Sequence, residues 1–170
     1  MDALVASVDA VLPAGRTGKE AGVFWLGKRG SISTIRTVVV PSGPGVETTP
    51  WMWRVSPEVF GTLTRWAIPL QLTLLGVVHT HLKGTPPRLS LADRTESVQV
   101  PGILAVVIGN GGMDRDYRTW GWYTYDKVDF REFSRNELLN RVRVLPQAER
   151  EVWAVNSSSV WKITGKPSDE

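Results

Sequence analysis

The run Leu72-Thr73-Leu74-Leu75-Gly76-Val77-Val78-His79-Thr80-His81 is strongly apolar and ends on the only two histidines of the chain. Its leucine and β-branched residues predict a strand. Residues i and i+2 of a strand share one face, with Cα atoms about 6.5 to 7 Å apart, so both imidazoles can reach one ion at about 2 Å. The pattern therefore indicates a zinc site at the end of this strand.

A third ligand is available in Ser90-Leu91-Ala92-Asp93, where Asp93 offers a carboxylate. Three protein ligands leave the fourth tetrahedral position to water, which distinguishes a catalytic zinc site from a closed structural one. Each fragment also has a structural interpretation. A histidine in a strand is often a core or edge residue, and Ser90-x-x-Asp93 is a variant of the helix capping box.

Composition narrows the class of protein. A chain of 170 residues with 42% hydrophobic residues predicts one domain with a substantial core. The chain has no cysteine, which excludes a disulfide framework, a thiol nucleophile, a Cys-based zinc ribbon and a Cys-ligated deaminase site. The net charge of +3 is interspersed, so nucleic acid is not an expected partner. Arg131, Arg135, Arg141 and Arg143 form a basic patch that could attract an acidic partner, but we interpret them as a solvated helix face.

The N-terminal residues do not resemble a secretory signal. Asp2 and Asp9 interrupt the first dozen residues, and no basic segment leads into them. The longest apolar run, residues 68–78, is far shorter than the roughly 18 residues that a bilayer span needs. We therefore expect a cytoplasmic protein without a membrane partner.

The first half of the chain predicts a helix, a hairpin and a second helix. Residues 2–12 predict a short helix ended by Pro13. Residues 22–27 are apolar on both faces, which predicts a covered central strand paired as a hairpin with residues 32–40. Residues 41–50 are predicted as a surface loop, 51–54 as a short half-buried strand, and 57–67 as a helix capped by Ser56.

The second half of the chain also predicts helices separated by strands. Ser90 should open a helix that ends near residues 100–101, and residues 103–108 predict a fully apolar strand. Residues 119–125 alternate aromatic with small residues, which predicts an antiparallel strand with one exposed face. Ser134-Arg135-Asn136-Glu137 is a capping box for a helix running to about Val144.

Strands separated by helices in this order predict a three-layer α/β domain in which helices flank a central mixed β-sheet. We assign residues 1–145 to this domain. Residues 146–170 are predicted to form a C-terminal extension, weakly structured or packed on the domain, with short strands at 152–155 and 160–163 and a frayed tail at 166–170.

The order of these motifs resembles the JAB/MPN family with its JAMM zinc metalloprotease motif. Glu20-Ala21-Gly22 leads a hydrophobic run that ends at Gly27, and His79-Thr80-His81 and Ser90-Leu91-Ala92-Asp93 follow. The resemblance covers about residues 2–144. The chain departs from the family's pattern at Leu82, where proline usually follows the second histidine, and in a slightly longer spacer before Ser90.

The resemblance assigns roles residue by residue. His79, His81 and Asp93 would bind one Zn²⁺ ion with its water, and Glu20 would act as general base on that water. Ser90 would donate a hydrogen bond to the oxyanion of the tetrahedral intermediate. Glu47 is an alternative base, on a less exact platform, whereas Asp114 and Asp116 are interpreted as loop charges.

The resemblance also implies a substrate. A JAMM-type enzyme of this compact, bacterial kind would be a deubiquitinase-like isopeptidase or peptidase. It would cleave after the C-terminal tail of a ubiquitin-like or sulfur-carrier protein, within a conjugation pathway that includes E1-like and E2-like proteins and could serve antiphage defence. The tail would lie against an edge strand near residues 43–54. Two alternatives stay open: a non-catalytic MPN scaffold, and a RadC-like zinc hydrolase.

Overall fold

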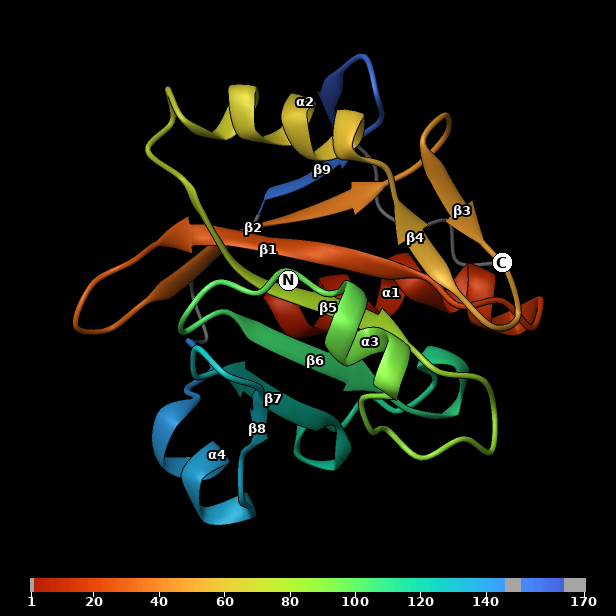
Figure 1. Ribbon diagram of the computed structural model, residues 1–170, viewed down its shortest axis with the longest axis vertical. Coiled ribbons are helices and arrows are strands. Elements are labelled where there is room, and N and C mark those ends of the chain that lie inside the picture. The colour runs from red at the N-terminus through yellow and green to blue at the C-terminus, as the bar shows by residue number, and fades with distance from the viewer. Residues whose placement is uncertain (1, 146–150, 164–170) are drawn as a thin grey trace.

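The computed structural model describes residues 2–145 and 151–163, and its elements form three layers (Figure 1). In chain order they are α1 (Ala3–Arg16), β1 (Gly22–Lys28), β2 (Thr34–Pro41), β3 (Val46–Thr48), β4 (Trp53–Val55), α2 (Pro57–Ala67), β5 (Thr73–Thr80), α3 (Leu91–Glu96), β6 (Leu104–Ile108), the 3-10 helices η1 (Asn110–Gly112) and η2 (Tyr117–Thr119), β7 (Gly121–Tyr125), β8 (Phe130–Glu132), α4 (Arg135–Arg141), β9 (Glu151–Val155) and β10 (Val160–Lys162).

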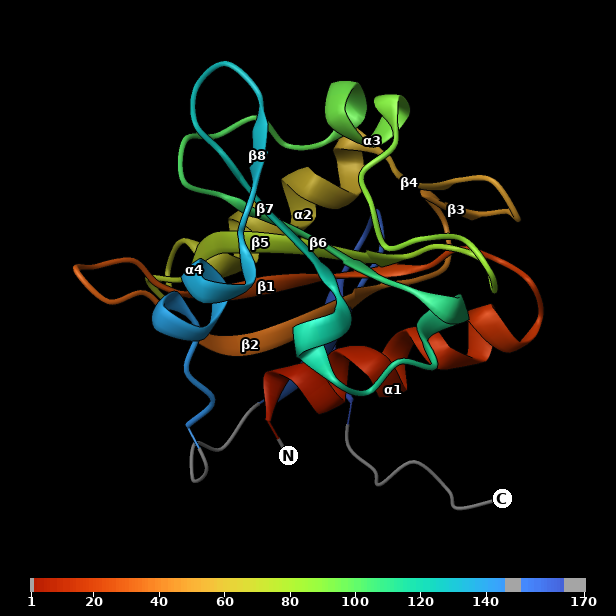
Figure 2. The ribbon, with the colours of Figure 1, turned by 90° about the horizontal axis from the view of Figure 1, so that it is seen from below.

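The central layer is an eight-stranded sheet in the order β10-β9-β2-β1-β5-β6-β7-β8. The β5–β6 and β2–β9 pairs are parallel and the other pairs are antiparallel, so the sheet is mixed. α1 covers one face, while α2, α3 and the β3–β4 hairpin lie on the other (Figure 2). The predicted three-layer α/β class is confirmed.

β1 shows how the sheet builds a core on both faces. Phe24 and Leu26 point toward α2, and Val23 and Trp25 point toward α1; each is at most 1% exposed. A strand covered on both faces is apolar at successive positions, as the sequence of β1 is. β5 pairs with β1 in antiparallel register, which places Gly22 opposite His79. The carboxyl end of β5 and the amino end of β1 therefore lie side by side, at the same end of these two central strands.

α1 and α3 end at different residues from those that the sequence predicted. α1 continues through Pro13 to Arg16. Pro13 removes one helical hydrogen bond, but the turn after it packs so closely on η1 that a Cβ at Gly15 would collide with the carbonyl group of Gly111. α3 stops at Glu96 rather than near residue 100, because Ser97 is extended.

Two strand predictions also need correction. The predicted loop at 41–50 contains β3, which pairs with β4 as a hairpin, and Trp51 lies outside the strand with 82% exposure. β7 is covered on both faces in its first half, because Trp122 packs on the α1 side and Tyr123 on the α2 side. The 22–27 and 32–40 hairpin, the helix at 57–67, and the strands at 72–81 and 103–108 are confirmed within a few residues.

The described part of the C-terminal extension belongs to the main sheet. β9 pairs with β2, and β10 pairs with β9 at the sheet's outer edge. The frayed tail predicted at 166–170 lies outside the described residues, and the division at residue 145 stays a prediction. Among the helices described, none has the length and apolar character that a membrane span requires.

Candidate metal centre

The two histidines lie at the carboxyl end of β5, on the face covered by α2 and α3. His79 is 5% exposed and His81 is 6% exposed. His81 follows the last strand residue, but its main chain is fixed on both sides: its N–H donates to the carbonyl of Ile108 at 3.1 Å, and its carbonyl accepts from the N–H of Gly111 at 2.8 Å. Both imidazoles therefore project from a rigid backbone.

Asp93 in α3 completes a group of three donors. The Nε2 atoms of His79 and His81 are 3.2 Å apart, and the Asp93 oxygens lie 3.3 Å from Nε2 of His79 and 3.2 Å from Nε2 of His81. Ligands at about 2.0 to 2.1 Å from a tetrahedral zinc ion are separated by about 3.3 Å. Two imidazoles and a carboxylate at these separations fit a metal ion such as zinc.

The backbone around these ligands orients them. Nδ1 of His81 lies 3.4 Å from the carbonyl oxygen of Pro86, which favours the tautomer with its proton on Nδ1 and a free lone pair on Nε2. Oδ2 of Asp93 accepts a hydrogen bond from the N–H of Ser90 at 2.7 Å, and the Asp93 N–H donates to Oγ of Ser90 at 3.1 Å. This capping box sets both where α3 begins and where its carboxylate points.

The charges of these three residues favour a bound cation. Burial opposes ionisation of Asp93, but hydrogen bonds with His79 and His81 hold the pKa of the carboxyl well below its usual range. Burial likewise opposes protonation of His81, yet the hydrogen bond and charge of Asp93 and the charge of Glu20 raise its pKa. Metal-free, the cluster attracts positive charge, which is the condition for cation binding.

Glu20 reaches the same cluster from the segment that joins α1 to β1. Its N–H donates to the carbonyl of Thr49 at 2.8 Å. Next to it, the N–H of Ala21 donates to Oγ1 of Thr80 at 3.1 Å, which ties this segment to the end of β5. Burial raises the pKa of Glu20, and the nearby charges of His81 and His79 partly offset that rise. A half-buried carboxylate with a raised pKa beside a metal ligand set is suited to accept a proton.

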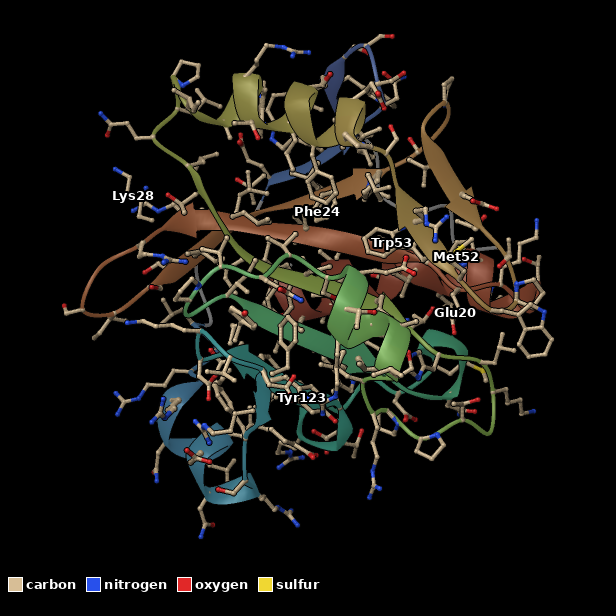
Figure 3. All side chains as sticks on the ribbon, viewed as in Figure 1. Glu20, Phe24, Lys28, Met52, Trp53 and Tyr123 are labelled. Atoms are coloured by element: carbon tan, nitrogen blue, oxygen red, sulfur yellow. The ribbon has the colours of Figure 1, made fainter. Side chains whose placement is uncertain are left out.

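The cluster opens into a cavity of about 430 Å³ between the β3–β4 hairpin and α3. Glu20, Met52 and Trp53, which are labelled in Figure 3, all line this cavity. The polar end holds the five residues predicted from the sequence: Glu20, His79, His81, Ser90 and Asp93. The apolar part is lined by Phe24, Val55, Phe60, Val77 and Val98, of which sequence patterns identified none as site residues.

Gly22 allows β1, β5 and the side chain of Trp53 to pack closely beside the site. A Cβ at this position would lie 2.5 Å from the carbonyl oxygen of Val78 and 2.6 Å from the ring of Trp53. Only glycine therefore allows β1, β5 and the indole to approach so closely. The ring of Trp53 also packs on Phe24, with centroids 5.7 Å apart, and forms a wall of the cavity.

The other charged residues considered in the sequence lie elsewhere. Glu47 is exposed on β3 opposite Arg54 and does not line the cavity. Asp116 caps η2 and pairs with Arg118 at 2.7 Å. Arg131 of β8 and Arg141 of α4 both approach Glu137 and lie over the ring of Phe133, so these two arginines form an exposed surface shared by a strand and a helix, not a helix face alone.

Comparisons with known proteins find similarity to solved structures only. A scan against models of protein families finds no match, and a search of curated proteins finds none. Among solved structures, the chain is similar to a protein from Salinibacter ruber determined in solution, with 18% identity, 84% of this chain and 90% of that one covered, and a TM-score of 0.48. It is also similar to a JAB1/MPN domain protein from Archaeoglobus fulgidus, with 13% identity, 74% and 87% covered, and a TM-score of 0.40.

Likeness at these values does not define an activity. What the described residues themselves define is a mixed α/β domain with a His-His-Asp group that could hold a metal ion, beside a half-buried carboxylate and an open cavity. The function is therefore derived from the geometry of the site.

Proposed function

We propose that this chain is a zinc-dependent isopeptidase or peptidase of the JAMM type, which cleaves after the C-terminal tail of a ubiquitin-like or sulfur-carrier protein. The observation that carries the proposal is the convergence of His79, His81 and Asp93, in which the Nε2 atoms are 3.2 Å apart and each lies within 3.3 Å of one Asp93 oxygen, with Glu20 lining the same cavity. Zinc, when bound there, acidifies water and polarises a carbonyl group.

The chain's own residues supply the remaining chemistry. Glu20 accepts a proton from the attacking water and passes it to the leaving amine, as its half-buried position and raised pKa suit it to do. The oxygen of the Ser90 hydroxyl accepts from the N–H of Asp93, so its O–H is free to donate to the oxyanion that develops on the substrate. His79, His81 and Asp93 hold the ion in place.

The free edge of β4 supports binding of an extended tail. Hydrogen bonds from Ser56 N–H to Gly45 and from Thr49 N–H to Met52 identify the directly bonded pairs of the β3–β4 hairpin. Since bonded and non-bonded pairs alternate, the main-chain groups of Trp53 and Val55 face away from β3. Both residues line the cavity, so a tail added to this edge would run toward the metal ligands.

The test is hydrolysis of a ubiquitin-like protein fused through its C-terminal tail to a fluorescent reporter. We expect cleavage by zinc-loaded protein, loss with a chelator, and recovery on adding zinc. Glu20→Gln should lower kcat by about 10²- to 10⁴-fold while the zinc content stays stoichiometric. Glu47→Gln is the matched control, because it removes an equivalent carboxylate outside the cavity, and it should retain wild-type rates.

Cleavage that survives complete removal of zinc would overturn the mechanism. Protein without stoichiometric zinc, and with Glu20→Gln indistinguishable from wild type, would instead point to a non-catalytic scaffold. Salt-dependent DNA binding, with affinity falling steeply as salt rises, would favour the RadC-like alternative over a ubiquitin-like substrate.

A further inference from the structure

The two sides of the metal site differ in how they are anchored. His79 and His81 are carried by β5, which is hydrogen-bonded to a strand on each side. Asp93 is carried by α3, a helix of only six residues, none of them buried, with Leu91 78% exposed. Leu89 before the helix and Val98 after it pack in the core, but α3 itself buries no apolar side chain, so polar contacts help to fix the position of the carboxylate.

Arg94, the residue after Asp93, makes a second set of polar contacts, on the side of α3 away from the histidines' strand. Its Nη1 donates to the carbonyl of Phe130 at 2.7 Å and to Oδ1 of Asp129 at 3.1 Å. Its guanidinium also lies 5.6 Å from the ring centre of Tyr123, which is 1% exposed. One planar group thus connects α3 to β7 and β8 through two hydrogen bonds and a stacked aromatic ring.

The contact at the other end of α3 is weaker. Glu96 pairs with Arg54 of β4 at 3.0 Å, but both side chains are more than half exposed, at 55% and 54%. Exposed ion pairs contribute about 0 to 1 kcal/mol. The Arg94 side chain is 30% exposed and two of its three partners, Phe130 and Tyr123, are buried. Apart from the contacts of Asp93 with the two histidines, Arg94 is therefore the principal side-chain connection between α3 and the sheet.

We propose that Arg94 is a positioning residue for the metal site: by clamping α3 to β7 and β8, it holds Asp93 at ligand distance from His79 and His81. Arg94 does not line the cavity, so it acts through Asp93 and not on substrate. The inference rests on the metal site of the proposed function, but not on the identity of the substrate.

The test measures metal binding apart from hydrolysis. Zinc affinity is determined by competition with a chromophoric chelator for wild type, Arg94→Met and Arg94→Lys. Each variant should bind zinc about 10- to 100-fold more weakly, the loss typical of residues that support a metal ligand. Lysine should not rescue, because a point charge replaces neither the planar fork nor the stacking. Arg118→Met is the matched control, since Arg118 also pairs with an aspartate but in η2.

A second readout separates positioning from general stability. The thermal midpoint of the metal-free protein should be similar in Arg94→Met and Arg118→Met, and Co²⁺ absorption should show an altered ligand field only in Arg94→Met. Wild-type zinc affinity in both Arg94 variants, or a loss explained wholly by unfolding of the metal-free form, would overturn the inference. Failure of wild type itself to bind zinc would overturn the metal site, and with it the proposed function.

Discussion

Two capping boxes of the same local geometry occur in the described part of the chain, and only one of them lies at the candidate site. In α3, the serine and carboxylate are Ser90 and Asp93; in α4, they are Ser134 and Glu137. Both boxes make the reciprocal pair of hydrogen bonds. The α4 carboxylate turns to Arg131 at 3.0 Å, whereas the α3 carboxylate faces two imidazoles. The motif sets where a helix starts, and the neighbours supplied by the fold decide whether its carboxylate can bind a metal.

The largest expected contrast comes from neutralising each carboxylate. Asp93→Asn keeps an oxygen for the Ser90 N–H but removes the charge that a cation needs, so zinc affinity should fall by more than about 100-fold, beyond the usual effect of a supporting residue. Glu137→Gln should leave zinc affinity unchanged. Metal analysis after dialysis measures both. Equal zinc contents in the two variants would show that the α3 box is as purely structural as the α4 box.

Removing each serine gives a smaller contrast. Ser90→Ala and Ser134→Ala should each lower the free energy of unfolding by about 1 kcal/mol, the usual effect of losing an N-cap. Only Ser90→Ala should also lower kcat, by about 10²- to 10³-fold, because the same hydroxyl is proposed to donate to the oxyanion. Denaturant unfolding and the reporter assay provide the two measurements. Equal kcat values for both variants would remove the oxyanion role from Ser90.

The smallest expected effect is on the pH dependence of the α4 box. Hydrogen bonds from Ser134 and then Arg131 lower the pKa of Glu137 from about 4.5 to about 2. Because the folded pKa lies below the unfolded one, the stabilisation is complete above about pH 4.5 and is lost as the pH falls toward 2. An NMR titration of the Glu137 carboxyl measures the shift. Arg131→Met should move the pKa part of the way back toward 4.5, because it removes the guanidinium and leaves the Ser134 N–H in place, and an unchanged value would contradict the part assigned to Arg131.

The sequence predicted those parts of the site that depend on local geometry. The i, i+2 spacing of His79 and His81 put both side chains on one face of a strand, and the Ser90-x-x-Asp93 spacing marked a helix start. The place of Glu20 came from the family resemblance, since its approach to His79 depends on the pairing of β1 with β5, which sets Gly22 opposite His79, more than 50 positions away. Periodicity could not predict that pairing.

Other features left no local signal. The β3–β4 hairpin forms within a segment rich in proline and glycine, and the early end of α3 depends on Ser97 adopting an extended backbone. Arg94 looks like any surface arginine in the sequence. Its role depends on Tyr123 and Phe130, which tertiary structure alone brings to it. The position of β9 between β2 and β10 likewise requires a parallel pairing with β2 across more than 100 residues.

The contact between Gly15 of α1 and Gly111 of η1 links the N-terminal helix to the main chain of a proposed metal ligand. α1 lies on the face opposite the cavity, yet its last turn presses on η1, and the N–H of Gly111 in η1 holds the carbonyl of His81. The N-terminal helix is therefore part of the scaffold of the metal ligands. A bulky side chain at position 15 would displace η1 and, through it, the main chain of His81. It would disturb the metal ligands without touching the cavity or changing any residue that lines it.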